Sequence, residues 1–286
     1  MTLEQIKLVG VAGSGLMGQG IAHVVAVAGY PVILYDVDVA LAEKGRAQIK
    51  MLLEKDVIKG RRGSAEAEQI LARITPSGSL PDLSDADWIF EAVFEKTTVK
   101  QKLFSALDGI CKPDCIFATN TSGLSITEIA SATERSGRFV GTHFFNPVPV
   151  MKLLEIVRGY DTSEETFCLA LDFGQKIGKE TIAVKEAPLF CVNRILVPML
   201  NEAMFVFSEG IASAEDIDTG MRLGANHPIG PLALSDLIGL DTLLLVTQTL
   251  YHETGDSKYR PCPLLVQLVR AGHYGRKSGR GFYTYQ

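Results

Sequence analysis

The chain has 286 residues, of which 47% are apolar and 21% charged. This length exceeds a typical single domain of about 150 residues, so we expect two domains, and the composition excludes an intrinsically disordered chain. The net charge of -5 argues against a nucleic-acid-binding protein and against one held on a membrane surface by basic residues. No apolar stretch reaches the roughly 20 residues that a membrane-spanning helix needs.

Five scattered cysteines form no Cys-x-x-Cys pair, and no histidine stands at zinc-ligand spacing from them. Cys111 and Cys115 could be half of a metal site, but Lys112 and Pro113 between them are typical of a surface turn. We expect reduced thiols and no metal, which is usual for a protein of the cytoplasm. The first residues include the acidic Glu4 and no signal-type apolar core, which also favours a cytoplasmic location.

Strand and helix patterns alternate along the first 186 residues. Short apolar runs, typical of strands buried on both faces, occur at residues 7–12, 32–35, 88–93, 116–119, 139–142, 153–157 and 181–184. Helical periodicity occurs at residues 21–28, 40–59, 99–110 and 164–177. Such alternation indicates βαβ units, so we expect a Rossmann-type α/β domain with a mainly parallel sheet over residues 1–186.

The pattern changes at Glu186-Ala187-Pro188. Beyond this point only helical runs follow, at residues 192–207, 214–223, 232–251 and 263–271. Because proline interrupts regular structure, we place a domain boundary there. Residues 187–286 are expected to form an all-helical domain.

A glycine motif lies between the first predicted strand and the first predicted helix. Gly13, Gly15 and Gly18 form a Gly-x-Gly-x-x-Gly pattern in which a tight turn lets backbone N–H groups approach a pyrophosphate. Leu16 and Met17 lie inside it and share the expected contact. Asp36 ends the next strand, where an acid binds the adenosine ribose and repels the 2′-phosphate of NADP. The pattern favours NAD over NADP and FAD; the alternative is a glycine-rich turn with a surface Asp.

Polar residues suited to redox chemistry follow three later strands. Ser122 closes one strand, His143 another, and Glu155 belongs to a third, at the sheet edge where α/β proteins bind ligands. An imidazole with one nitrogen on a carboxylate can take a proton from an alcohol with the other. Ser122, and Asn193 from the second domain, could hold the reacting oxygen.

Each of these residues also has an ordinary structural explanation. His143 could be a hydrogen-bonded structural residue, Glu155 a solvated charge, and Asn193 a helix cap. The remaining histidines are interpreted as structural (His23, His227) or as surface residues (His252, His273). Spacing alone does not decide between the catalytic and the structural interpretation of these residues.

Six longer segments carry a resemblance to a known family. They read GSGLMGQGIA at 13–22, NTSGLSIT at 120–127, HFFNPVPVMKLLE at 143–155, VNR at 192–194, GANHPIGP at 224–231 and GRGFY at 279–283. The sequence resembles the L-3-hydroxyacyl-CoA dehydrogenase family over almost its whole length. It is most similar to the short bacterial members, which act on 3-hydroxybutyryl-CoA.

The resemblance implies reversible NAD-dependent oxidation of an L-3-hydroxyacyl-CoA to a 3-ketoacyl-CoA. It implies His143 as general acid/base, Glu155 as its partner, and Ser122 and Asn193 as contacts of the reacting oxygen. It also implies Lys55, Lys59 and Arg61 as CoA contacts, since CoA phosphates need local positive charge, and Ser122 as a further substrate contact. The alternative for the basic residues is a solvated run of charges. Outside the glycine turn, the expected NAD contacts are Asp36, Glu95, Lys100, Asn120, Ser122, Asn146 and Lys277.

Some positions depart from the family pattern. Gly123 stands where a second serine is frequent, and Thr119 where serine is frequent. Leu189 replaces a usual glycine before Phe190, which puts acyl-chain preference in doubt more than the chemistry.

Two other functions remain as alternatives: a related dehydrogenase of a free hydroxy acid such as L-gulonate, and a non-catalytic structural protein that keeps the dinucleotide fold. Only an acyl-CoA dehydrogenase requires the lysines after Ala40 to bind CoA, so these lysines distinguish it from both alternatives. By analogy with the family, and because residues 240–246 are strongly apolar, we expect a homodimer formed through the helical domain.

Overall fold

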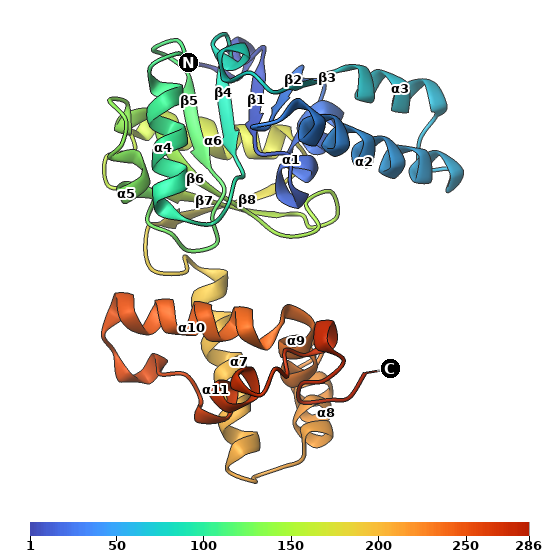
Figure 1. Cartoon of the computed structure of the whole chain (residues 1–286), viewed down its shortest axis with the longest axis vertical. Coiled ribbons are helices and arrows are strands. Elements are labelled where there is room, and N and C mark those ends of the chain that lie inside the picture. Colours follow the sequence, from blue (N-terminus) through green and yellow to red (C-terminus); the bar gives the residue numbers. More distant parts are fainter. Residues whose placement is uncertain (286) are drawn as a thin grey trace. The chain divides into compact units, whose positions relative to one another are not determined.

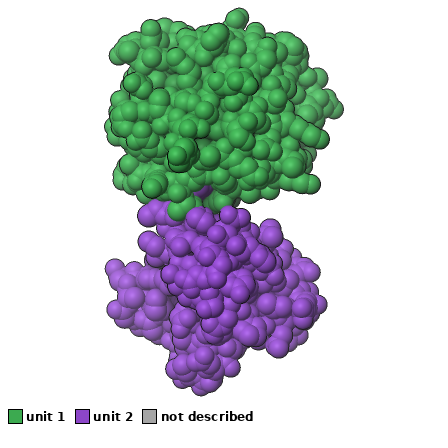
Figure 2. All heavy atoms as spheres, turned by 90° about the vertical axis from the view of Figure 1, so that its left-hand side faces the viewer, with its two compact units in different colours: residues 1–187 green, residues 188–286 purple. Residues whose placement is uncertain are grey.

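The computed structural model describes residues 1–285. The chain forms two compact units, distinguished by colour in Figure 2, of which the first is Met1–Ala187 and the second begins at Pro188. The division therefore falls between residues 187 and 188, next to the expected boundary between 186 and 187.

Unit 1 is built on one eight-stranded sheet with the order β3-β2-β1-β4-β5-β6-β7-β8 (Figure 1). Every neighbouring pair is parallel except β6 and β7, which are antiparallel. The strands are β1 Val9–Ala12, β2 Val32–Tyr35, β3 Ile74–Ser77, β4 Trp88–Glu91, β5 Ile116–Thr119, β6 Phe139–Phe144, β7 Leu153–Arg158 and β8 Glu180–Lys185. The predicted Rossmann-type sheet is confirmed.

Six helices belong to this unit: α1 Leu16–Val27, α2 Val39–Ile58, α3 Ser64–Ala72, α4 Thr97–Asp108, α5 Ile126–Ala130 and α6 Glu164–Lys176. Helices α4 and α6 cover opposite faces of the sheet (Figure 1). Phe173 of α6 packs against Trp88 and Phe90, whereas Phe104 of α4 packs against Phe117 and Phe139. Each such aromatic pair contributes about 0.5–1.5 kcal/mol beyond the area that it buries.

Several helices begin with a side chain that satisfies a free backbone N–H group. Asp38 accepts from the amide of Ala40 at the start of α2, and Ser163 accepts from the amide of Thr166 at the start of α6. Such caps stabilise a helix by about 1 kcal/mol.

Short 3-10 helices lie at Leu3–Gln5, Leu80–Leu83, Ser136–Arg138, Ser257–Tyr259 and Arg276–Ser278.

Between residues 188 and 285, unit 2 contains five α-helices: α7 Val192–Ser208, α8 Ala214–Gly224, α9 Pro231–Ile238, α10 Leu240–Thr254 and α11 Pro263–Arg270. Their apolar faces share one core that includes Leu200, Leu232 and Leu265. Two buried carboxylates fasten the end of the chain: Asp236 accepts from the amide of Tyr283, and Asp218 from its hydroxyl. The predicted all-helical domain is confirmed.

The structure corrects two sequence expectations. The single helix expected over residues 232–251 is two helices, α9 and α10, bent by 97° where Gly239 has a φ of 104°. The strand β3 and the helices α3 and α5 were missed, because β3 contains Pro76, which the edge of a sheet tolerates, and the two helices are short.

Among residues 1–285, no single helix is both long and apolar enough to cross a membrane. The bent pair α9 and α10 passes that test by length and composition only.

Candidate active site

The turn between β1 and α1 has the geometry that a dinucleotide requires. Gly13 has a φ of 103°, and a Cβ atom on Gly18 would lie 1.7 Å from the Gly13 carbonyl oxygen, so both positions exclude other side chains. A Cβ on Gly15 would meet no atom within 4 Å. Leu16 is exposed at the start of α1, and Met17 is half-buried. The helix N-terminus thus offers open space and backbone donors to a phosphate.

Asp36 is held against this turn. Its Oδ2 accepts from the backbone and the hydroxyl of Ser14, at 2.8 Å and 2.6 Å, and its Oδ1 accepts from the amide of Val37. A carboxylate offers about four acceptor positions, and these bonds leave room for one more donor. Ser14 was not singled out from the sequence, because the position between two motif glycines tolerates many residues.

A buried ion pair organises the ends of β4 and β5. Lys100 and Glu91 are both fully buried, and the Lys100 Nζ lies 2.7 Å and 2.9 Å from the two Glu91 carboxylate oxygens. The same Nζ donates to the backbone oxygen of Asn120 at 2.8 Å and lies 3.2 Å from Glu95. The expected NAD contact Lys100 therefore lies inside the protein, beneath Asn120. Sequence reasoning missed Glu91, although an acid that ends an apolar strand was a signal.

The loop after β5 is held by hydrogen bonds to the segment after β4 and to β6. Glu95 accepts hydrogen bonds from the Thr121 hydroxyl and, at 2.8 Å, from the Ser122 backbone. The Asn120 Oδ1 accepts from the amide of Phe144 in β6 at 3.2 Å. The structure thereby brings together three of the expected contacts, Glu95, Asn120 and Ser122.

His143 and Glu155 face one another across the antiparallel pair. They are direct partners in the register of β6 and β7, and the His143 Nδ1 lies 2.5 Å from the Glu155 Oε2. Both side chains are buried, with exposed fractions of 5% and 0%. The ring of Phe145 lies 4.4 Å from the imidazole, centre to centre. Side chains directly opposite in such a pair are close enough to interact, so strand register alone explains the contact.

Asn146 lies in the connection between β6 and β7, which comprises residues 145–152. It is exposed, and it is joined to Pro147 by a cis peptide bond. The connection therefore starts two residues after His143 and leads directly into β7, which carries Glu155.

Two expected site residues belong to unit 2. Asn193 lies in the first turn of α7, and the Lys277 Nζ lies 2.7 Å from the Asp241 Oδ2 at the start of α10. Burial opposes ionisation of Asp241, but its bonds to Lys277 and to the backbone keep the pKa of its carboxyl below the usual value. Leu189, which departs from the family pattern, has a φ of 63° in the left-handed region that glycine prefers.

The expected CoA-binding lysines lie at the end of α2. Lys55 occupies the last turn of that helix and Lys59 its C-cap, and both are exposed. Arg61, in the link to α3, forms an ion pair with Asp56 at 3.4 Å.

Three further side chains of reactive types are buried in unit 1. His23 of α1 is buried, and burial lowers its pKa to about 4, so it is neutral at physiological pH. Cys111 and Cys115 are buried thiols. Within residues 1–285, no group of three or more metal-binding side chains is found.

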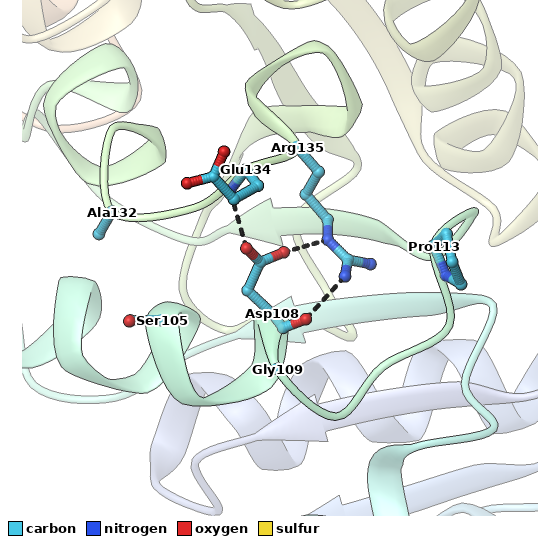
Figure 3. A pocket seen from close by; sticks show the side chains of 7 residues that line it. All are labelled: Ser105, Asp108, Gly109, Pro113, Ala132, Glu134 and Arg135. Carbon is cyan, nitrogen blue, oxygen red and sulfur yellow. Dashed lines mark hydrogen bonds and ion pairs between the residues drawn. The ribbon is translucent and has the colours of Figure 1, made fainter.

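A surface hollow of about 540 Å³ lies between the end of α4 and the segment after α5 (Figure 3). Asp108, at its centre, forms an ion pair with Arg135 and accepts from the amide of Glu134. Arg135 also donates to the backbone oxygens of Asp108 and Lys112. These bonds cap the C-terminus of α4 and account for both charges.

Comparisons with known proteins agree with this geometry. Residues 8–187 match the model of the 3-hydroxyacyl-CoA dehydrogenase NAD-binding domain, and residues 190–285 match the C-terminal domain of the same enzymes. The chain is 49% identical over 282 residues to a probable 3-hydroxybutyryl-CoA dehydrogenase of Bacillus subtilis, covering 99% of this chain and 98% of that one.

Two further proteins are similarly close. A 3-hydroxybutyryl-CoA dehydrogenase of Bradyrhizobium diazoefficiens is 48% identical, covering 98% of this chain and 96% of its own. The crystal structure of (S)-3-hydroxybutyryl-CoA dehydrogenase from Ralstonia eutropha has a TM-score of 0.97 at 48% identity, covering 99% of this chain and all of that one. The chain described here belongs to the 3-hydroxyacyl-CoA dehydrogenase family and carries its NAD-binding domain.

Proposed function

We propose that this protein catalyses the reversible NAD-dependent oxidation of an L-3-hydroxyacyl-CoA to a 3-ketoacyl-CoA, with 3-hydroxybutyryl-CoA as the substrate. The observation that carries the proposal is the buried contact of 2.5 Å between His143 and Glu155. It lies on the strands that follow β5 in the sheet, and β5 leads into Asn120 and Ser122.

The glycine turn supports NAD as the cofactor. The open space beside Gly15 and the close contact of Gly18 with Gly13 suit a pyrophosphate at the N-terminus of α1. Asp36 ends β2 and would accept a ribose hydroxyl while repelling a 2′-phosphate. When bound, NAD supplies the acceptor for the hydride that leaves carbon 3 of the substrate.

His143 moves the proton in this proposal. Its Nδ1 is engaged by Glu155, so its Nε2 takes the proton of the 3-hydroxyl group as the hydride departs. The Glu155 carboxylate fixes the orientation of the ring and stabilises the imidazolium. In the reverse direction, the protonated Nε2 donates to the developing alkoxide of the 3-ketoacyl-CoA.

The remaining expected site residues position the reactants. Ser122 and Asn193 hold the reacting oxygen, and Glu95, which accepts from the Ser122 backbone, keeps that loop in place. Lys100 supports the same loop from below through Asn120. Lys55 and Lys59 attract the phosphates of CoA, while Asn146 and Lys277 complete the NAD contacts.

We further propose a cytoplasmic homodimer in which residues 1–186 bind NAD and residues 187–286 contribute substrate contacts and the dimer surface. Large apolar side chains exposed on α9 and α10, Leu237 and Leu245, support this surface. Sedimentation velocity tests it: a monomer at micromolar concentration would contradict the dimer.

A nicotinamide absorbance assay tests the proposed reaction directly. The purified protein is mixed with NADH or NADPH and with acetoacetyl-CoA, longer 3-ketoacyl-CoAs, or a free keto acid. We expect NADH oxidation with acetoacetyl-CoA and much slower turnover with NADPH. Absence of turnover with every acyl-CoA, in a sample that binds NADH, would refute the proposed reaction.

A further inference from the structure

Lys179 is a buried cation that the proposed mechanism does not use. It lies between α6 and β8, and only 7% of it is exposed. Gly178, with a φ of 81°, ends the preceding helix in the left-handed conformation and turns the chain back towards the sheet. The amide of Lys179 then donates to the Gly174 carbonyl at 3.0 Å. Burial lowers the pKa of the Lys179 amine, so this position carries a cost that some interaction must offset.

The amine is directed at the connection between β6 and β7. Its Nζ donates to the carbonyl oxygen of Val148 and, at 2.9 Å, to that of Met151. Pro147 and Pro149 have no N–H group, and the amides of Val150 and Met151 both donate to the Pro147 oxygen at 2.9 Å. The connection therefore has few backbone donors for its own carbonyls, and a lysine about 30 residues later supplies them.

The same connection touches the dinucleotide helix. A Cβ atom on Gly20 of α1 would lie 2.6 Å from the Val148 Cβ, so the loop packs directly on the helix that begins at the glycine turn. Asn146, an expected NAD contact, is two residues before Val148. One clamp on two carbonyls thus sets the position of the loop against α1.

We propose that Lys179 is a positioning residue for the cofactor: its ammonium group holds the β6–β7 connection so that Asn146 and the start of α1 meet NAD together. The inference rests on the proposed function for the identity of the cofactor. The His143–Glu155 contact depends instead on the register of β6 and β7, so loss of the clamp affects NAD binding more than it affects the proton step.

The test replaces Lys179 by Met, which has a similar shape and no donor. We expect the Kd for NADH, measured by its fluorescence, to rise by about tenfold, because two buried carbonyls lose a charged donor. The KM for acetoacetyl-CoA should stay within about twofold of the wild-type value on that reasoning. Lys176→Met, an exposed lysine at the end of α6, is the matched control and should change neither.

Two further measurements separate positioning from stability alone. Lys179→Arg keeps the charge and the donors and should recover most of the NADH affinity. Hydrogen–deuterium exchange of peptide 145–152 should accelerate in Lys179→Met and not in Lys176→Met. If Lys179→Met does not fold, Lys179→Gln, which keeps one amide donor, is measured in the same way.

A lowered melting temperature with unchanged NADH affinity would overturn the inference, as would equal rises in the Kd for NADH and in the KM for acetoacetyl-CoA. NADH binding is measured without acyl-CoA. A wild-type protein that binds NADH but reduces no 3-ketoacyl-CoA would therefore refute the proposed reaction and leave the role of Lys179 to be decided by the binding data.

Discussion

The glycine turn and the His143–Glu155 contact belong to one sheet but are built in different ways. The turn is local: Gly13, Gly15 and Gly18 lie within six residues, and backbone geometry alone creates the open space at the start of α1. The proposed catalytic contact is non-local, because it joins two strands whose register places residue 143 opposite residue 155.

The difference teaches how each part can fail. A local turn fails when a single Cβ fills it, whereas a cross-strand contact fails when either side chain is replaced or when the strands slip. Substitutions in the two regions should accordingly separate cofactor binding from proton transfer.

The largest effect is expected from His143→Gln. Removal of the proton-transfer group should lower kcat by at least about 100-fold, since general acid–base catalysis contributes roughly 10²–10⁴-fold. The KM for acetoacetyl-CoA should change little, because Gln keeps a polar group of similar size. Steady-state kinetics with NADH measure both values. Turnover near the wild-type rate would remove His143 from this role.

Glu155→Gln should have a smaller effect on the same step. The amide still reaches the imidazole but brings no negative charge to stabilise its protonated form, so kcat should fall on the order of tenfold. NADH affinity, measured by fluorescence, should remain that of the wild type. A loss of NADH affinity equal to the loss of kcat would mean that the two regions are not separable.

Gly15→Ala and Gly18→Ala test the turn as a matched pair. The methyl group at residue 15 enters open space, so the melting temperature should be unchanged while the Kd for NADH rises about tenfold. The methyl group at residue 18 meets the Gly13 oxygen, so Gly18→Ala should lower both stability and affinity. Wild-type NADH affinity in Gly15→Ala would contradict a pyrophosphate at this position.

The smallest effect is expected from the double variant Lys55→Ala/Lys59→Ala. Both lysines are exposed, where single charge contacts are weak, so the KM for acetoacetyl-CoA should rise only roughly fivefold and less at high salt. Lys44→Ala/Lys50→Ala on the same helix is the control. An unchanged KM would favour a free hydroxy acid as the substrate.

Parts of the fold follow from local patterns that the sequence displays. The strands β2 and β5 were predicted to the residue, since each is a short, mostly apolar run that is followed by a polar residue, Asp36 or Asn120. The helix break at Gly239 was not predicted, because α9 and α10 form one continuous apolar pattern. Gly239 has a φ of 104°, and it is the packing of the two helices that selects this conformation. The edge strand β3 was not predicted either, because it contains Pro76, and a proline normally indicates that a segment is not a strand.

The sequence by itself determined the α/β character of the first domain and the helical character of the second, the glycine turn, and which residue types stand at the ends of most strands. Only the tertiary structure decided which elements and side chains are in contact. It shows that β7 runs antiparallel to β6, that Lys100 forms an ion pair with Glu91, and that Lys179 donates hydrogen bonds to the β6–β7 connection. The physical reason is that periodicity and turn chemistry act over a few neighbouring residues. Strand pairing and the burial of charged groups are settled by contacts between residues far apart in the chain.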